Sequence, residues 1–587
     1  MSVGTGKGRR KMAAIHMGLA EESFKLCVGH DIFQNDGSAY DRKTWQGTAA
    51  RGMSEAFQVI LKSAEPALLT LDEQTVFHRK GMLPVYRLAA DCPLPVTLRH
   101  VGMVTGDDQL RYGDILLGNP AAELEAGTPA AVYIEVEVPY GMPAGAYTGT
   151  LCLYRSLGFS GEEKTETLSF GIEVFDYDFP APENRRFYLD LWQHPASIAR
   201  KAEVPLWSDR HFSLLEPYLR LLADLGQRAI TAIVSEIPWC GQAGFMERRC
   251  TTDLYEYSMI RVFRRDDGGI RMDFSALDRY LQLCYQCGFR PDCEIEVFGL
   301  VNVWRFDEYG FGGPAEEYPE AIRIRVREQD GRYGYLTSDR EIDQYIQALE
   351  THFRDSGRLE YVRIAADEPA DTERFRRSLE HLKKTAPGFR YKAAINHAEF
   401  IGEFQDEIDD FVPIYDCLTA ENAELRSMRS AMPEKRFLWY VCCCPAFPNF
   451  FISSSLLEGR AVGALTYAEG LDGFLRWDFT VWNEDPRRDL RYPRFPCGDM
   501  NFVYPAGDMS PFLSLRYQTL KRGLEDYELL AALGERGRDD LTGELLAMMV
   551  KGKGLAEAAA SAGELLSLDF RDYASARRRA LEALSSS

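Results

Sequence analysis

The sequence of 587 residues lacks several features that would place it in a particular functional class. It contains no uninterrupted apolar run of about 18 residues, the length that a membrane-spanning helix needs, so no membrane partner is expected. Basic residues are in deficit, and the formal net charge of −21 argues against binding to nucleic acid. The basic residues near the start are not followed by an apolar run of signal-peptide length, which predicts a cytoplasmic location.

The thirteen cysteines do not form a disulfide framework, because their number is odd and their spacing is irregular, so reduced thiols are expected. Cys284 and Cys287 have the spacing of half a zinc motif, but no second pair completes it, and both fit one face of a predicted helix. Cys442, Cys443 and Cys444 follow a predicted strand, where successive side chains alternate between faces, so they are not expected to share an ion. The sequence therefore predicts no metal site and no cofactor.

The pattern of apolar residues changes near residue 182. Residues 1–20 are predicted to be a leader segment, and residues 21–182 contain short strands between turns. The stretch 132–139 alternates apolar and polar residues, as a half-buried antiparallel strand does. Many short strands with few helical stretches favour a β-sandwich domain for residues 21–182.

Residues 183–515 alternate predicted strands with predicted helices, which is typical of a (β/α)8 barrel of the TIM type. An open doubly wound sheet competes with this prediction, but no glycine-rich phosphate loop follows the first strand. Residues 516–587 are predicted to form a C-terminal helical segment, so the fold class is a multidomain protein with an all-β and an α/β part. The eight predicted strands are 187–193, 229–234, 292–297, 361–366, 391–396, 411–415, 436–441 and 473–477.

Two adjacent carboxylates follow the fourth predicted strand and precede a predicted helix. Asp367 and Glu368 stand at the carboxyl end of this strand, where barrel enzymes carry their active sites. Because a proline disfavours helical dihedral angles in the residue before it, Pro369 is expected to hold Glu368 extended. A simpler interpretation is that the two acids complement the dipole of the following helix.

The ends of the other predicted strands carry further acidic, amide and aromatic side chains. Aromatic rings stack on the apolar face of a sugar while acids and amides bind its hydroxyl groups, so a carbohydrate is the predicted partner. The predicted binding residues are His194, Trp239, Asn396, Tyr415, Trp439, Tyr440 and Trp477 at strand ends, with Asn449 and Tyr504 from loops; Glu296 also ends a predicted strand.

Cleavage of a glycosidic bond requires a protonated acid at the leaving oxygen and a second group that stabilises the positive anomeric centre. Ordinary glycosidases place two carboxyl groups on opposite sides of the bond, which adjacent residues do not easily do. The Asp367–Glu368 pair fits substrate-assisted catalysis better, with the 2-acetamido oxygen of the sugar as nucleophile, Glu368 as acid and Asp367 next to the acetamido nitrogen. Mutual repulsion and partial burial would raise the pKa of one carboxyl group, as a general acid requires.

Several motifs, in order along the chain, resemble the glycoside hydrolase family 123 group, which includes domain of unknown function 4091. They are Asp367-Glu368-Pro369, residues 132–139 followed by 143–150, residues 471–477, and Arg516 with residues 522–528. The resemblance implies a retaining exo-hydrolase of β-linked N-acetylgalactosamine. It further implies that Glu368 is the acid/base and that Asp367 orients the acetamido group.

Two alternatives remain open. A two-carboxylate retaining glycosidase would act on a sugar without an acetamido group, with Glu368 as acid and Asp416 or Asp472 as nucleophile. A non-catalytic carbohydrate-binding protein would keep the same fold without turnover, although it has no need for two repelling carboxylates at one strand end.

Overall fold

The computed structural model describes residues 15–28, 38–71, 83–238, 255–301, 322–369, 371–420, 422–492, 495–551 and 559–586. The chain divides into two compact units, Met1–Phe179 with Leu581–Ser587, and Pro180–Ala580. Trp239, one of the predicted binding residues, lies outside the described residues. Among the described residues, no helix combines the length and the apolar character needed to cross a membrane.

The first unit consists of two β-sheets. In one sheet the order is β1 (Ile15–Glu21), β4 (Ser54–Ser63), β10 (Pro129–Glu137), β7 (Val96–Thr105) and β8 (Arg111–Leu117), with β2 (Cys27–Val28) paired to β8. In the other sheet the order is β3 (Thr44–Arg51), β12 (Glu162–Asp178), β11 (Gly145–Ser156), β6 (Val85–Asp91), β5 (Ala67–Thr70) and β9 (Ala121–Leu124).

Aromatic side chains join the two sheets face to face. The ring of Phe57 in β4 stacks on Trp45 of β3 at 4.5 Å and contacts Phe170 of β12 at 5.3 Å. The structure differs from the prediction for β10, because this strand is buried on both faces. Its Tyr133 is fully buried and donates a hydrogen bond of 2.5 Å to Glu22, which meets the hydrogen-bonding need of the hydroxyl group.

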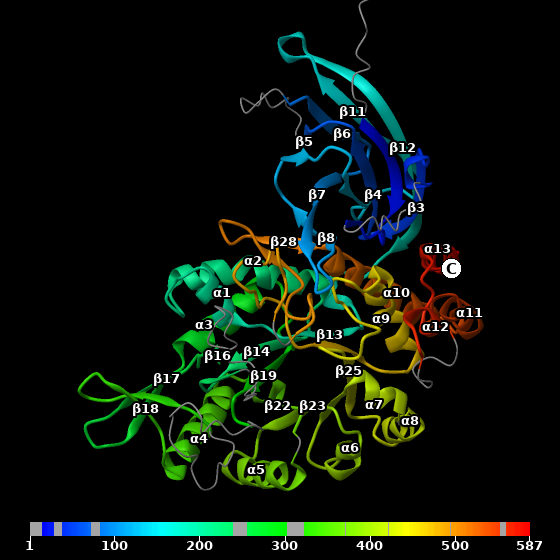
Figure 1. The fold of residues 1–587 in the computed structure, drawn as a ribbon. Helices are drawn as coiled ribbons and strands as arrows, with labels where there is room; N and C mark the ends of the chain where they lie inside the picture. Colours follow the sequence, from blue (N-terminus) through cyan, green and yellow to red (C-terminus); the bar gives the residue numbers. More distant parts are fainter. Residues whose placement is uncertain are drawn as a thin grey trace, which may run out of the picture. The chain divides into compact units, whose positions relative to one another are not determined.

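The second unit contains an eight-stranded parallel sheet (Figure 1). Each of the eight predicted strands is present and differs from its prediction only at its ends. In spatial order the strands are β13 (Tyr188–Leu191), β26 (Gly473–Arg476), β25 (Arg436–Tyr440), β24 (Asp410–Pro413), β23 (Arg390–Ile395), β22 (Val362–Asp367), β19 (Glu294–Phe298) and β14 (Ala229–Ile233).

This sheet curls into a nearly closed barrel. The ammonium group of Lys392 in β23 lies 2.5 Å from Asp190 in β13, although three strands separate β13 from β23 in the sheet. Such a contact requires the sheet to bend around its own interior. One isolated parallel bridge, Leu189 with Gln227, links β13 to the residues just before β14 and so spans the seam between the first and the last strand of the sheet.

Helices follow most of the strands. They are α1 (Pro195–Lys201), α2 (Asp209–Leu225), α3 (Ser275–Gln286), α4 (Asp339–Asp355), α5 (Thr372–Thr385), α6 (Glu399–Glu403), α7 (Tyr415–Ala420), α8 (Asn422–Ala431) and α9 (Leu456–Ala468). In α4 the buried Ile342, Tyr345, Ile346, Leu349 and Phe353 recur with helical period, so this helix packs one apolar face against the strands.

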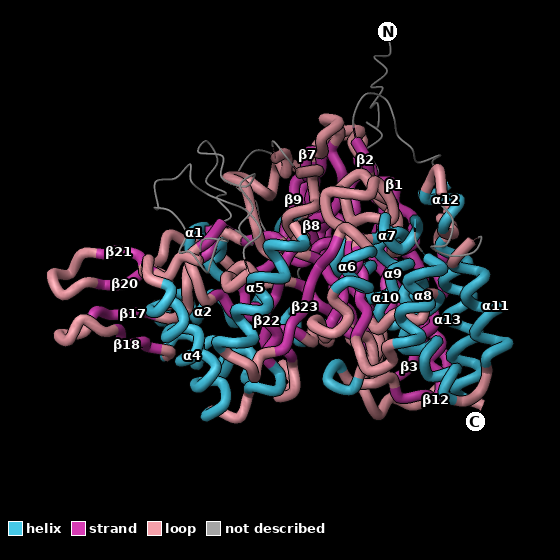
Figure 2. Tube along the Cα trace, turned by 90° about the horizontal axis from the view of Figure 1, so that it is seen from below, coloured by secondary structure: helices cyan, strands magenta, loops and turns pink. Residues whose placement is uncertain are grey.

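Four short strands form a separate sheet at one side of the second unit: β18 (Ile270–Asp273), β17 (Arg261–Arg264), β20 (Arg325–Arg327) and β21 (Tyr333–Tyr335). Figure 2 shows these strands projecting away from the parallel sheet. The remaining short strands are β15 (Ile237–Pro238), β16 (Tyr255–Glu256), β27 (Tyr504–Pro505) and β28 (Pro511–Ser514).

The C-terminal part is helical, as predicted, and comprises α10 (Leu515–Glu535), α11 (Asp539–Met549), α12 (Ala562–Leu565) and α13 (Phe570–Ser585). Helices α9 and α10 cross at glycines, because a Cβ atom on Gly463 would lie 1.9 Å from the carbonyl oxygen of Gly523. Glu528 of α10 accepts hydrogen bonds from the backbone N–H groups of Arg186 and Phe187, directly before the first barrel strand.

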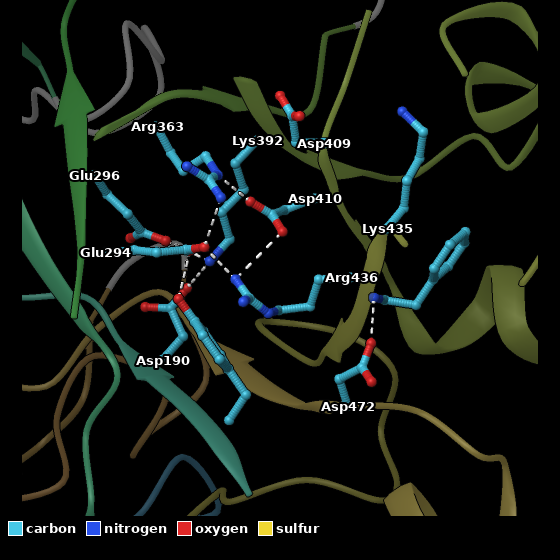
Figure 3. A network of polar contacts seen from close by, with 12 residues as sticks. Asp190, Glu294, Glu296, Arg363, Lys392, Asp409, Asp410, Lys435, Arg436 and Asp472 are labelled. Carbon is cyan, nitrogen blue, oxygen red and sulfur yellow. Dashed lines mark hydrogen bonds and ion pairs between the residues drawn. The ribbon is translucent and has the colours of Figure 1, made fainter. Parts of the chain in front are cut away.

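Charged side chains fill the interior of the parallel sheet near the amino-terminal ends of its strands (Figure 3). Lys392 donates to Asp190 and to Glu296, while Arg363 donates to Asp410 at 2.5 Å. The linked charged residues of this network are Asp190, Glu294, Glu296, Arg363, Lys392, Asp410 and Arg436. All seven come from strands, so the network ties together strands that are not neighbours in the sheet.

We expect Lys392→Met to destabilise the second unit by about 3–5 kcal/mol, because it leaves two buried carboxylates without their cation. The matched control is Arg220→Met, which breaks an exposed ion pair with Glu216 in α2 and should cost less than about 1 kcal/mol. Urea denaturation followed by tryptophan fluorescence measures both changes. Equal midpoints for the two variants would show that the network does not stabilise the barrel.

Candidate active site

A cavity of about 260 Å³ lies at the carboxyl ends of the parallel strands. It combines carboxyl, amide, phenol, thiol and aromatic groups in one concave surface. The residues that line it are Asp367, Glu368, Asn396, Ile414, Asp416, Tyr440, Cys442, Cys443, Cys444, Trp477 and Phe495.

The alternation of side chains along β-strands explains why several of these residues meet. Residues four apart on a strand point to the same face of a sheet. Each of three strands therefore carries one charged residue of the interior network and, four positions later, one residue of the cavity: Arg363 and Asp367 on β22, Lys392 and Asn396 on and directly after β23, Arg436 and Tyr440 on β25.

The backbone at Glu368 turns sharply. Its φ angle is +48°, in the left-handed region that non-glycine residues seldom adopt, so the expectation of an extended Glu368 is wrong. Pro369 disfavours the right-handed helical conformation, and the chain turns by the left-handed route instead. The N–H group of Glu368 donates a hydrogen bond of 2.8 Å to the carbonyl of Ala394 in β23, which fixes the turn to the sheet.

The carboxyl group of Glu368 lies between two hydrogen-bond donors. The hydroxyl group of Tyr440 is 2.5 Å from one oxygen, and the amide nitrogen of Asn396 is 3.3 Å from the other. Burial raises the pKa of Glu368 above the ordinary glutamate value, and the hydrogen bond from Tyr440 offsets part of that rise. A half-buried carboxyl group with a raised pKa is suited to donate a proton.

Asp367 and Trp477 both line the cavity. Asp367 is the last residue of β22 and is buried except for its cavity side. The indole N–H of Trp477 donates to Asp499 at 3.3 Å, and its ring packs against Phe495 at 5.4 Å. The cavity thus combines an aromatic residue, Trp477, with the carboxyl groups of Asp367 and Glu368, a combination that suits a sugar ring.

Two predicted binding residues on the barrel do not reach the cavity. Trp439 precedes Tyr440 on β25 and therefore points to the opposite face, where its indole N–H donates 2.8 Å to Thr466 in α9. Tyr415 is buried against Trp439, with ring centroids 6.1 Å apart. The residues on either side of Tyr415, Ile414 and Asp416, line the cavity in its place.

His194 is also placed outside the cavity. It is fully buried, its Nε2 lies 2.9 Å from the carbonyl of Trp477, and its Nδ1 lies 3.5 Å from Glu256. Burial alone would lower the pKa of His194, but the charges of Asp478 and Glu256 outweigh it and raise the pKa. His194 is therefore a structural partner behind Trp477.

Asn449, in a loop, and Tyr504, which begins the short strand β27, are part of the framework that surrounds the cavity. Asn449 is buried and donates to the carbonyls of Cys442 and Pro445 at 2.9 and 2.7 Å. Tyr504 is fully buried, and its hydroxyl group accepts a hydrogen bond of 3.3 Å from Arg516. The structure also places Glu296 in the interior network, away from the cavity.

The two alternative nucleophiles lie at opposite ends of the barrel. Asp416 lines the cavity. Asp472 precedes β26 and accepts hydrogen bonds from Arg429 and from the N–H of Phe437, at the amino-terminal end of the sheet. The structure therefore excludes Asp472 as the nucleophile and leaves Asp416 near Glu368.

The three consecutive cysteines lie close together, contrary to the expectation from strand alternation. The sulfur of Cys442 is 3.9 Å from that of Cys443 and 4.0 Å from that of Cys444. Strand β25 ends at Tyr440, and the N–H of Cys442 donates back to the carbonyl of Cys444 at 2.9 Å. Alternation does not apply in this bend, which begins directly after the strand.

A family model for the catalytic domain of glycoside hydrolase 123 matches residues 192–533. A solved structure of a family 123 glycoside hydrolase from Clostridium perfringens, from work on glycolipid glycan hydrolysis, is similar with a TM-score of 0.75 and 18% identity, covering 98% of each chain. A β-D-glucuronidase from Dictyoglomus thermophilum matches with a TM-score of 0.30 and 10% identity, over 81% of this chain and 67% of that one. No curated protein matches the chain. The chain belongs to glycoside hydrolase family 123, and it is a glycosidase.

Proposed function

We propose that this glycosidase removes terminal β-linked N-acetylhexosamine, of the N-acetylgalactosamine type, by substrate-assisted catalysis with retention. The observation that carries the proposal is the position of Asp367 and Glu368, which are adjacent in sequence and line the same cavity. The cavity volume of about 260 Å³ is below the roughly 300–1,000 Å³ of sites for drug-sized ligands, which favours one terminal sugar unit over an internal stretch of polymer.

In this mechanism Glu368 protonates the glycosidic oxygen while the acetamido oxygen of the same sugar attacks the anomeric carbon. The C–O bond to the leaving group breaks and a cyclic oxazolinium intermediate forms. Asp367 accepts a hydrogen bond from the acetamido N–H, which positions the group and balances the positive charge that it develops. Glu368 then removes a proton from water, which opens the ring on the same face that the leaving group occupied.

The neighbours of Glu368 support its part in this cycle. Tyr440 and Asn396 hold the carboxyl group at one side of the cavity, and the left-handed turn places it beyond the end of β22. Burial raises the pKa of Tyr440 well above the ordinary tyrosine value, so Tyr440 remains a donor when Glu368 is ionised. The aromatic ring of Trp477 would stack on the sugar.

We further infer that the parallel sheet and its helices form a complete (β/α)8 barrel. The order of the eight strands, the contacts across the interior and the bridge between Leu189 and Gln227 support this inference. The place of the cavity at the carboxyl ends of the strands is the usual one for enzymes of that architecture.

One specific observation favours a second candidate. Asp416 lines the cavity with Glu368, so a two-carboxylate mechanism on a sugar without an acetamido group has a candidate nucleophile. In the substrate-assisted mechanism Asp367 is essential and Asp416 is not, whereas in the two-carboxylate mechanism Asp416 is the nucleophile. Substitutions at the two positions therefore distinguish the mechanisms.

We expect Glu368→Gln to lower kcat for an aryl N-acetyl-β-galactosaminide by about 10²–10⁴-fold, because glutamine cannot donate the proton to the leaving oxygen. The loss should be smaller for substrates with acidic aryl leaving groups, which need less protonation. The thermal midpoint should stay close to that of the parent protein, which separates lost chemistry from lost folding. Undiminished turnover of a poor leaving group would contradict the assignment.

A comparison of Asp367→Asn with Asp416→Asn separates the two mechanisms. Under substrate assistance, Asp367→Asn lowers kcat for N-acetylated substrates by about 10²-fold or more, since a positioned charge on the acetamido nitrogen is lost. Asp416→Asn should have the smaller effect, and aryl glycosides without the acetamido group should be poor substrates for the parent enzyme. A larger loss of kcat in Asp416→Asn than in Asp367→Asn, with azide restoring the activity of Asp416→Asn, would favour the two-carboxylate mechanism.

Tyr440→Phe should shift the alkaline limb of the kcat/KM profile to higher pH. The Tyr440 hydroxyl group stabilises the ionised form of Glu368 and so lowers its pKa. Without it the already raised pKa rises further, and the acid stays protonated at higher pH. Profiles of the parent and the variant on the same aryl substrate test this sign, and an alkaline limb that stays in place or moves to lower pH would contradict it.

A further inference from the structure

The three thiols in the cavity wall have nearly the spacing of three of the four ligands of a tetrahedral metal site. Three thiolates around a tetrahedral ion with bonds of about 2.3 Å have sulfur–sulfur distances of about 3.8 Å. The sulfur of Cys442 lies 3.9 and 4.0 Å from those of Cys443 and Cys444, and all three sulfur atoms lie within 4.8 Å of one another. Small side-chain rotations suffice to bring the three sulfur atoms onto one ion.

The loop that carries the thiols is fixed by buried hydrogen bonds. Asn449 donates to the carbonyls of Cys442 and Pro445, and its own oxygen accepts from Arg476 at 3.1 Å. The N–H of Asn449 donates to Glu458 at 3.0 Å, which anchors the loop to α9. A backbone held in this way presents the three sulfur atoms with little conformational entropy left to lose, as a metal site requires.

The exposure of these thiols distinguishes them from structural cysteines. Cys443 and Cys444 are exposed and Cys442 is half-buried, whereas Cys284 and Cys293 are buried, as packing residues are. Among the described residues the three consecutive cysteines are also the group whose donor atoms lie close enough to hold one ion. Packing therefore does not explain why three accessible thiols meet at this point.

We propose that Cys442, Cys443 and Cys444 form a binding site for a thiophilic d¹⁰ cation, of which Zn²⁺ and Cd²⁺ are representatives. Each of the three thiols releases its proton when the ion binds, and the resulting thiolates supply three ligands. Glu368 and Asp416 line the same cavity, so a carboxylate oxygen or a water molecule there supplies the fourth ligand.

The position of the site links metal binding to activity. An ion on the three sulfur atoms occupies the cavity in which Glu368 and Asp367 lie, and it brings positive charge next to Glu368. The ion also takes up space in this cavity that the sugar needs. The cation therefore inhibits hydrolysis, and this consequence rests on the proposed function, whereas the binding does not.

Titration of the full-length protein with Cd²⁺, with a phosphine reductant in place of thiols, tests the binding directly. We expect a thiolate-to-cadmium charge-transfer absorption that saturates at one ion per chain. The Cys442→Ser/Cys443→Ser/Cys444→Ser variant should lose it, whereas the matched control Cys92→Ser, which removes a half-exposed thiol in the first unit, should keep it. An absorption that survives the triple substitution, or no absorption in the parent protein, would overturn the proposal.

The single variant Cys443→Ser controls for misfolding of the triple variant. Its side chain is exposed, and its replacement removes one ligand from an otherwise intact loop. Its affinity for Cd²⁺ should fall by more than about tenfold. In the parent enzyme, the same concentration of Cd²⁺ should abolish aryl glycoside hydrolysis, and a chelator should restore it, while the triple variant keeps the same rate with and without Cd²⁺. Charge transfer without inhibition would keep the site but remove its link to the proposed activity, so the two claims fail separately.

Discussion

The ammonium group of Lys392 lies in the interior of the parallel sheet between Asp190 and Glu296, which belong to two other strands. This contact can form only when the sheet is curled, so the burial of Lys392 depends on the curvature of the sheet. Burial of the cation without its carboxylates costs several kcal/mol, and burial of the carboxylates without the cation costs a similar amount. The network therefore penalises a slip in strand register, because a slip by one residue would turn these side chains toward the helices.

The same register places the residues that line the cavity. Counting four positions from Arg363, Lys392 and Arg436 leads to Asp367, Asn396 and Tyr440, and all three line the cavity at the carboxyl ends of the strands. The amino-terminal half of the interior is filled by the charged network, which leaves space for a ligand only at the other half. Glu368 departs from this pattern, because a left-handed turn carries its carboxyl group beyond the strand end to Tyr440. The backbone therefore places the two adjacent carboxyl groups differently: Asp367 follows the strand register, and Glu368 follows the left-handed turn.

The periodicity of the sequence was sufficient to predict the eight strands, the helices between them and the acidic pair. It was not sufficient to predict which face of the sheet a side chain lies on. Trp439 and Tyr440 both end a strand, and only the register shows that Tyr440 faces the cavity while Trp439 packs on α9. Asn449 and the three cysteines lie beyond a strand end, where periodicity no longer applies, and their positions depend on hydrogen bonds that the sequence pattern does not show. The motif residue Arg516 lies in the framework, where it donates to backbone carbonyls.

Membership of family 123 establishes a glycosidase, and the choice of substrate depends on what Asp367 contacts. A crystal structure of the enzyme with an N-acetylgalactosamine-derived thiazoline, a mimic of the cyclic intermediate, tests this point most directly. The account predicts that the thiazoline nitrogen lies within hydrogen-bond distance of Asp367, with Glu368 above the anomeric carbon and the sugar ring on Trp477. A thiazoline nitrogen remote from Asp367, with Asp416 directly below the anomeric carbon, would contradict it.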